Sequence, residues 1–277
     1  MPTIEANGQT LYYEMHGEGE PLLAVMGLAA DTTAWTLQVP AFAAQHRTVI
    51  FDNRDVGQSS MADGSYEISD MARDALAVAD ALELESFHLL GVSMGGAIAQ
   101  EVALAAPERV LTLTLAVTWP RGGPWAAKLS ELWGARVRHM SREQRVDELM
   151  LLTLSEAFFE NAEGVAWLRD LMLQYPYPQP PDAFARQLDA SSRHDARDRL
   201  ATLEIPTHVI GAEHDILVPV WKSRELAELI PGARLSVIEA CPHGLNLERA
   251  EEFNQLVLGF IEDQSRESSA SASSTVS

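Results

Sequence analysis

Gly91-Val92-Ser93-Met94-Gly95 has the form G-x-S-x-G, and it stands between an apolar run at residues 87–90 and a small-residue segment at residues 95–99. In that context the pattern predicts a sharp strand-to-helix turn that presents a serine hydroxyl at the carboxyl edge of a sheet. Glycines two residues on either side of Ser93 remove Cβ atoms that would collide in such a turn. The following helix would point its first N–H groups toward negative charge near Ser93. The pattern alone is weak, because about one chain in ten of this length carries it by chance.

The residues that a nucleophilic serine needs as partners follow later in the chain. A serine needs a base, and the base needs an acid that orients it. Residues 206–211 and 234–239 read as short buried strands, with Asp215 just after the first and His243 just after the second. Because the carboxyl ends of parallel strands meet at one edge of a sheet, we expect Ser93, Asp215 and His243 to lie together. The sequence therefore predicts a Ser-His-Asp triad.

Two neighbouring residues offer alternative roles. His214 is a rival base, but it stands beside Asp215, and side chains adjacent in sequence rarely orient each other well. Cys241 is the single cysteine and a conceivable nucleophile, but it lacks the elbow context and suits a small apolar site in the core. Taken singly, Ser93 could merely shape a turn and Asp215 could merely cap a helix.

Six stretches make the chain resemble an α/β-hydrolase from about residue 3 to residue 263. They are residues 26–28, 51–59, 91–95, 211–219 and 241–244, and a terminal amphipathic helix. Within that superfamily the chain is most similar to small carboxylesterases, enol-lactonases and polyketide methylesterases.

The resemblance also implies an oxyanion hole made by the backbone N–H groups of Leu28 and Met94. The loop that carries Leu28 usually begins His-Gly in this family, and here it begins Met26-Gly27. A main-chain donor tolerates that change of side chain. A second departure is Asp55, which stands where glycine is commoner, and we interpret its loop as structural packing near the site.

Alternating strands and helices indicate the α/β class, with an eight-stranded, mostly parallel sheet and helices on both faces. The resemblance identifies this arrangement as the α/β-hydrolase fold. We expect strands near residues 3–7, 10–16, 21–26, 48–52, 87–92, 110–117, 206–211 and 234–239, and core helices near 68–83, 95–106, 219–229 and 247–263.

The sheet-forming pattern is interrupted once. Residues 120–195 contain no convincing strand, and residues 121–200 hold 11 basic and 12 acidic residues in a chain whose net charge is −20. We therefore predict a hydrolase core at residues 1–119 and 196–264, and an all-helical cap at residues 120–195. The serine-rich segment 265–277 is predicted to be a disordered tail.

The cap and the nearby loops would enclose an apolar cavity with a few fixed polar groups. Aromatic residues at helical spacing more often pack in a core. Trp119 and Trp125 are the better candidates for substrate contact because they flank the entry to the cap. Trp35 and Leu217, on loops of the core, are the other candidates.

The composition excludes several partners. A net charge of −20 disfavours binding to nucleic acid or to an anionic membrane surface. The chain has no apolar run of about 18 residues and no visible signal peptide, which suggests a cytoplasmic protein. With no metal-ligand spacing, we expect neither a metal nor an organic cofactor. Monomer and homodimer both stay open.

Together these features predict a serine hydrolase that cleaves carboxylic esters or lactones of neutral, apolar small molecules through an acyl-enzyme. The alternatives are a C–C bond hydrolase or an acyltransferase on the same triad, or a small-molecule receptor without turnover. The resemblance argues against haloalkane dehalogenases and epoxide hydrolases, since these use an aspartate at the position of Ser93.

Overall fold

Eight strands form one sheet in the order β1-β2-β4-β3-β5-β6-β7-β8, in the computed structural model, which describes residues 2–274. The strands are β1 (Thr3–Ala6), β2 (Gln9–His16), β3 (Pro21–Val25), β4 (Arg47–Phe51), β5 (Phe87–Val92), β6 (Val110–Ala116), β7 (Thr207–Ala212) and β8 (Arg234–Ile238). Strand β2 pairs antiparallel with both β1 and β4, and every other neighbouring pair is parallel. This confirms the predicted mostly parallel sheet of eight strands.

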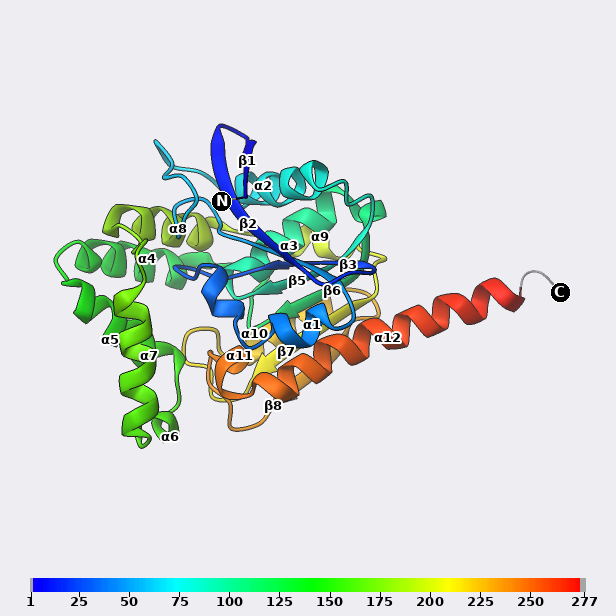
Figure 1. Ribbon diagram of the computed structural model, residues 1–277. Helices are drawn as coiled ribbons and strands as arrows, with labels where there is room; N and C mark the ends of the chain where they lie inside the picture. Colours follow the sequence, from blue (N-terminus) through cyan, green and yellow to red (C-terminus); the bar gives the residue numbers. More distant parts are fainter. Residues whose placement is uncertain (1, 275–277) are drawn as a thin grey trace.

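Helices cover both faces of this sheet (Figure 1). The core helices are α1 (Val39–Ala43), α2 (Ile68–Ala81), α3 (Met94–Ala105), α9 (Arg197–Leu200), α10 (Trp221–Leu229), α11 (Leu245–Glu248) and α12 (Ala250–Ser274), with 3-10 turns η1 (Thr32–Trp35) and η2 (Pro107–Arg109). Helices α2, α3 and α10 pack on one face, whereas α1 and α12 pack on the other.

Alternation along the central strands builds two core layers. In β3, Leu23 and Val25 point into the layer beneath α2 and α3, while Leu22 and Ala24 point into the layer beneath α1 and α12. All four side chains are at most 1% exposed. A strand buried on both faces in this way reads as a continuous apolar run, as the sequence of β3 does.

Between β6 and α9 the chain forms five helices and no strand among its described residues. They are α4 (Gly123–Val137), α5 (Arg142–Thr153), α6 (Glu156–Phe159), α7 (Ala162–Gln174) and α8 (Pro181–Arg193), and they form the green to yellow-green mass beside the sheet in Figure 1. Helix α5 begins at the capping box that Ser141 and Gln144 form. Helices α4 and α8 pack closely, with Trp133 and Phe184 edge-to-face at 5.1 Å.

The C-terminal segment differs from its prediction. The helix expected near 247–263 is divided in two, because Arg249 leaves the helical conformation between α11 and α12. Helix α12 then continues to Ser274, over most of the predicted disordered tail, and its final turns extend away from the body (Figure 1). Residues 275–277 lie outside the described residues. A helix that has already begun continues at low cost, since each further residue adds one hydrogen bond.

No helix in the described part of the chain has a stretch long and apolar enough to cross a membrane.

A buried histidine in β7 makes the stability of this fold depend on pH. His208 is fully buried, its Nε2 lies 2.8 Å from the Oγ of Ser236, and its ring packs on Phe260. Burial, with a smaller contribution from the charge of Arg234, lowers the pKa of His208 to about 4. The folded chain therefore keeps this imidazole neutral at a pH where the unfolded chain protonates it.

We expect His208 to reduce stability as the pH falls from about 6.5 to about 4. In that window only the unfolded state takes up the proton, so the free energy of unfolding should fall by up to about 1.4 kcal/mol per pH unit. Urea unfolding of the parent and of His208→Phe at pH 7, 6 and 5 measures this. Asp52, whose pKa is raised to about 6, acts in the opposite direction in both proteins, so their difference isolates His208. Parallel curves for the two proteins would contradict the prediction.

Candidate active site

The turn between β5 and α3 holds Ser93 in a strained conformation. Its φ of 57° and ψ of −121° lie outside the regions that a serine ordinarily adopts. The glycines on either side are required by close contacts: a Cβ on Gly95 would lie 2.0 Å from the carbonyl oxygen of Val25, and one on Gly91 would lie 2.3 Å from that of Gly95. The structure thus has the elbow geometry that the pentapeptide predicts.

Ser93, His243 and Asp215 form one continuous chain of hydrogen bonds. The Oγ of Ser93 lies 3.0 Å from Nε2 of His243, and Nδ1 of His243 lies 2.6 Å from Oδ2 of Asp215. With the imidazole proton on Nδ1, the ring donates to the carboxylate and can accept the serine proton at Nε2. These residues come from three strand ends, as the sequence predicts.

The carboxylate of Asp215 is held rigidly. Its side chain is fully buried, and its Oδ1 accepts the backbone N–H groups of Leu217 and Val218 at 2.8 and 2.7 Å. Its other oxygen is thereby directed at His243. An ionised carboxylate with three donors can orient an imidazole and stabilise its protonated form.

Backbone N–H groups lie beside the serine. Strands β3 and β5 are parallel neighbours, so the loop after β3 passes the elbow, and a Cβ on Gly27 would lie 2.9 Å from that of Ser93. In the part of the chain described, the N–H groups of Leu28 and Met94 have no protein hydrogen-bond partner. Both are therefore available to an anionic oxygen at Ser93, and their role as an oxyanion hole stays a prediction.

The rival residues lie in unsuitable surroundings. The Cys241 side chain is fully buried, and burial raises the pKa of its thiol to about 12, which keeps the thiol protonated at neutral pH. The His214 side chain is 65% exposed, and its nearest charged partner is Glu213 at 3.8 Å. Neither is part of the hydrogen-bonded chain.

The four predicted substrate contacts have different environments. Leu217 packs with Leu28 against a cap cluster formed by the buried residues Trp133, Val137, Phe184 and Leu188. Trp119 is half-buried against the main core, and its Nε1 has no partner among the described residues. Trp35 is completely buried in the layer beneath α1 and α12, and Trp125 is 64% exposed on α4. The structure therefore places Leu217 beside the cap cluster, Trp35 in the core and Trp125 at the surface.

A buried ion pair joins the cap to the core. Arg186 of α8 forms a bidentate pair with Asp55 at 2.7 and 2.8 Å, and the Asp55 side chain is fully buried. Asp55 also accepts the hydroxyl of Tyr66 and the N–H of Ala62. This contact explains the aspartate at a position where the resemblance leads one to expect glycine. No local sequence pattern indicates Arg186 as its partner.

A second buried carboxylate fixes the loop after β3. Asp52 accepts the N–H groups of Thr32 and Gln58, each at 2.7 Å. Burial raises its pKa to about 6, and the nearby charge of Asp31 adds to this effect. Asp52 therefore connects the loops that follow β3 and β4.

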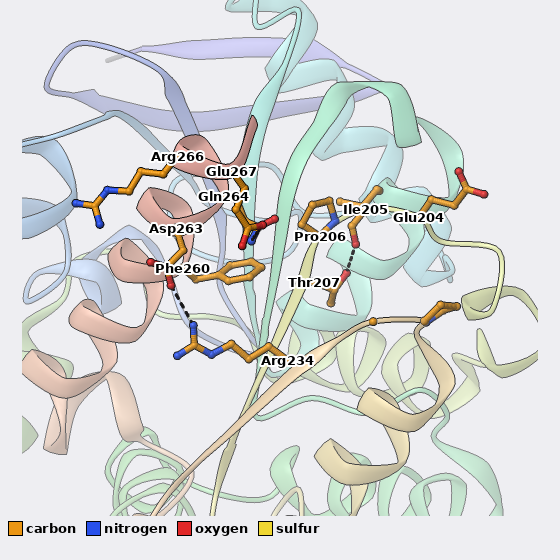
Figure 2. Close-up of a pocket in the computed structure, with 12 residues that line it drawn as sticks. Glu204, Ile205, Pro206, Thr207, Arg234, Phe260, Asp263, Gln264, Arg266 and Glu267 are labelled. Carbon is orange, nitrogen blue, oxygen red and sulfur yellow. Dashed lines mark hydrogen bonds and ion pairs between the residues drawn. The ribbon is translucent and has the colours of Figure 1, made fainter. Parts of the chain in front are cut away.

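A separate hollow of about 670 Å³ lies at the opposite edge of the sheet, where β7 and β8 begin. Figure 2 shows Phe260 in its wall and the ion pair between Arg234 and Asp263. Ser93 and its partners follow the other ends of the strands, so this hollow is not the site of the hydrogen-bonded chain. Among the described residues, no group of His, Cys, Asp or Glu is arranged to hold a metal ion.

Comparison with known proteins agrees with this architecture. A family model described as alpha/beta hydrolase fold matches residues 20–250. The chain is 32% identical over 264 residues to "Putative carbamate hydrolase RutD" of Azorhizobium caulinodans, covering 94% of this chain and 98% of that protein.

Two solved structures are similar over nearly their whole length. A hydrolase from Pseudomonas aeruginosa PA01 has a TM-score of 0.86 and 30% identity, covering 94% of this chain and 97% of its own. An enol-lactonase from Burkholderia xenovorans LB400 has a TM-score of 0.86 and 26% identity, covering 94% of this chain and all of its own.

We expect Arg186→Leu to lower the free energy of unfolding by about 3 kcal/mol, because it leaves the buried Asp55 carboxylate without its cation. Adding Asp55→Gly should restore part of the lost stability, because it removes the unpaired charge and because glycine suits the φ of 71° at this position. Recovery is incomplete because the Tyr66 hydroxyl and the Ala62 N–H lose their acceptor. Urea unfolding of the three proteins measures this.

Arg138→Leu is the matched control. Arg138, at the end of α4, also pairs with an aspartate, Asp182 of α8, but this pair is exposed and should contribute less than about 1 kcal/mol. A double variant as unstable as Arg186→Leu alone would refute the assigned role of the ion pair.

Proposed function

The chain belongs to the α/β-hydrolase family, and from that premise we propose that it is a serine hydrolase of carboxylic esters or lactones, with Ser93 as nucleophile. The observation that carries the proposal is the hydrogen-bonded chain from Ser93 through His243 to the buried Asp215. The exposed His214 and the protonated Cys241 provide no competing pair of nucleophile and base.

In the proposed reaction, Oγ of Ser93 attacks the acyl carbon while Nε2 of His243 takes its proton. The carbonyl oxygen becomes an anion that accepts the N–H groups of Leu28 and Met94, each contributing about 3 kcal/mol to transition-state stability. The imidazolium returns its proton to the departing alkoxide as the C–O bond breaks, leaving an acyl-enzyme. Water, activated by His243, then releases the acid and restores Ser93.

The surroundings of the site favour a neutral, apolar acyl or alcohol group. The cap cluster of Trp133, Val137, Phe184 and Leu188, with Leu28 and Leu217 against it, is apolar. Arg121, at the entry to the cap, lies 3.5 Å from Asp195, a carboxylate that it shares with Arg197. The described residues of the cap cluster include no cation that would hold a second carboxylate on the substrate.

The relatives add one specific candidate besides esters and lactones. Because a protein named as a carbamate hydrolase is 32% identical over most of both chains, carbamates are the second substrate class to test. A carbamate presents the same acyl carbon to Ser93. The molecule that attacks the acyl-enzyme distinguishes a hydrolase from an acyltransferase on the same triad, since it is water only in the hydrolase. Cleavage of a C–C bond would identify a C–C bond hydrolase, and absence of turnover would identify a small-molecule receptor.

We expect Ser93→Ala to lower kcat for p-nitrophenyl esters by about 10⁴-fold or more, because the covalent step is lost. The fold should persist, since the Ser93 side chain is only half-buried. A fluorophosphonate probe should modify the parent at Ser93, as measured by peptide mass mapping. Modification of Cys241, or full activity of Ser93→Ala, would sink the assignment.

Two matched pairs of variants control this experiment. Cys241→Ala should keep the activity that Ser93→Ala loses. His243→Ala should lose activity and His214→Ala should keep it, because only His243 contacts Ser93. A more damaging His214→Ala in a folded protein would mean that the base is misassigned.

For the substrate class, we expect kcat/KM for a p-nitrophenyl ester whose acyl chain ends in a methyl ester to exceed that for its free-carboxylate analogue by about tenfold. The strongly negative chain repels the charged analogue, and Arg121 is already paired. The measurement is made at low and at moderate salt. If the carboxylate substrate is preferred at both, and Arg121→Ala abolishes that preference, the neutral-substrate proposal is wrong.

A further inference from the structure

A glutamine of the cap contacts the loop that carries the predicted oxyanion donor. Gln187 of α8 is completely buried. Its Oε1 accepts the backbone N–H of Ala29 at 3.1 Å and the Nε2 of Gln179 at 2.9 Å, and its own Nε2 donates to the carbonyl of Arg54 at 2.8 Å. These bonds fix the side-chain amide in a single orientation.

The segment that Gln187 contacts is a tight turn. The N–H of Ala30 lies 3.4 Å from the carbonyl oxygen of Gly27, so Leu28 and Ala29 are the two central residues. Ala29 has a φ of 62°, which is the left-handed conformation that a type II turn requires at this position and for which glycine is favoured. An alanine there is strained, and a flip of the peptide between Leu28 and Ala29 would relieve the strain.

The bond from Ala29 to Gln187 opposes that flip, because only one orientation of the peptide directs its N–H at the buried amide oxygen. Gly27, at the start of the turn, is packed against Ser93, and Leu28 follows it directly. Leu28 thus lies between Gly27, which is packed against Ser93, and Ala29, which is bonded to Gln187, so the position of its N–H relative to the serine depends on both contacts.

We propose that Gln187 is a positioning residue for the reaction: from the cap, it holds the turn of residues 27–30 in the conformation that directs the Leu28 N–H at the oxyanion. This inference rests on the proposed function. It makes α8 a part of the catalytic framework as well as a wall of the site.

The alternative is that Gln187 only attaches α8 to the core. Its neighbour Arg186 has that role too, through Asp55, but has no hydrogen bond to residues 27–30. Arg186→Met and Gln187→Met therefore form a matched pair. Both remove a buried polar contact between α8 and the core, and only Gln187→Met frees the turn.

The experiment compares kcat, KM and inhibition by a trifluoromethyl ketone that carries the substrate's acyl group, at a temperature where all variants are folded. For Gln187→Met we expect kcat to fall by about 10- to 100-fold with KM nearly unchanged, since an oxyanion donor acts in the transition state. The inhibition constant should rise by a similar factor. Arg186→Met should keep a kcat close to that of the parent.

Two further variants keep the test decisive if Gln187→Met folds poorly. Gln187→Glu retains an acceptor for the Ala29 N–H and should lose less kcat. Ala29→Gly, combined with Gln187→Met, should recover part of the lost kcat because glycine adopts the left-handed turn without strain. Loss of attachment alone would not be repaired by a glycine in the loop.

Equal kcat values in Gln187→Met and Arg186→Met, or a change confined to KM, would overturn the positioning role and leave the proposed function intact. Absence of Ser93-dependent hydrolysis in the parent would overturn the proposed function, and the positioning role with it.

Discussion

The left-handed backbone at Ser93 is the constraint on which the remainder of the site depends. Such a conformation costs on the order of 1–3 kcal/mol in a residue with a side chain, so packing around it must hold it in place. Here the packing consists of close contacts at glycine positions. Gly95 lies against the carbonyl of Val25, and Gly27 lies against Ser93 itself. The adjacency of β3 and β5 makes these contacts possible, so the sheet order and the serine geometry are parts of one arrangement.

The cap and the core are joined by two kinds of contact that have different consequences. Phe184 and Leu188 of α8 make apolar contacts with the loop after β3. These contacts exclude water but tolerate small displacements of the helix. The hydrogen bonds of Arg186 and Gln187 tolerate little displacement, because the buried Asp55 carboxylate and the buried Gln187 amide would be left unsatisfied. About one turn of α8 thus carries both kinds of contact. The hydrogen bonds hold it rigidly to the loops of the core.

The site could be predicted from sequence where local pattern and topology were sufficient. The pentapeptide specified the turn at Ser93, and the strand ends then brought Asp215 and His243 to the same edge. The contacts of Asp55 and Gln187 could not be predicted in this way, since their partners lie more than 120 positions away in sequence. The aspartate in place of glycine was the one available signal, because a buried carboxylate needs a cation. The residue type alone could not show that Trp35 is buried in the core and that Trp125 is exposed at the surface. The burial of a tryptophan depends on which neighbouring elements pack against it.

The sealed environment of Cys241 has a practical consequence for work with this protein. It is the single thiol of the chain, and it is both inaccessible and protonated at neutral pH. Maleimide and similar reagents need an accessible thiolate, so they should not modify Cys241 in the native chain. A cysteine introduced at any exposed position would then be a unique attachment point for a fluorophore, a spin label or a solid support, without prior removal of the native one.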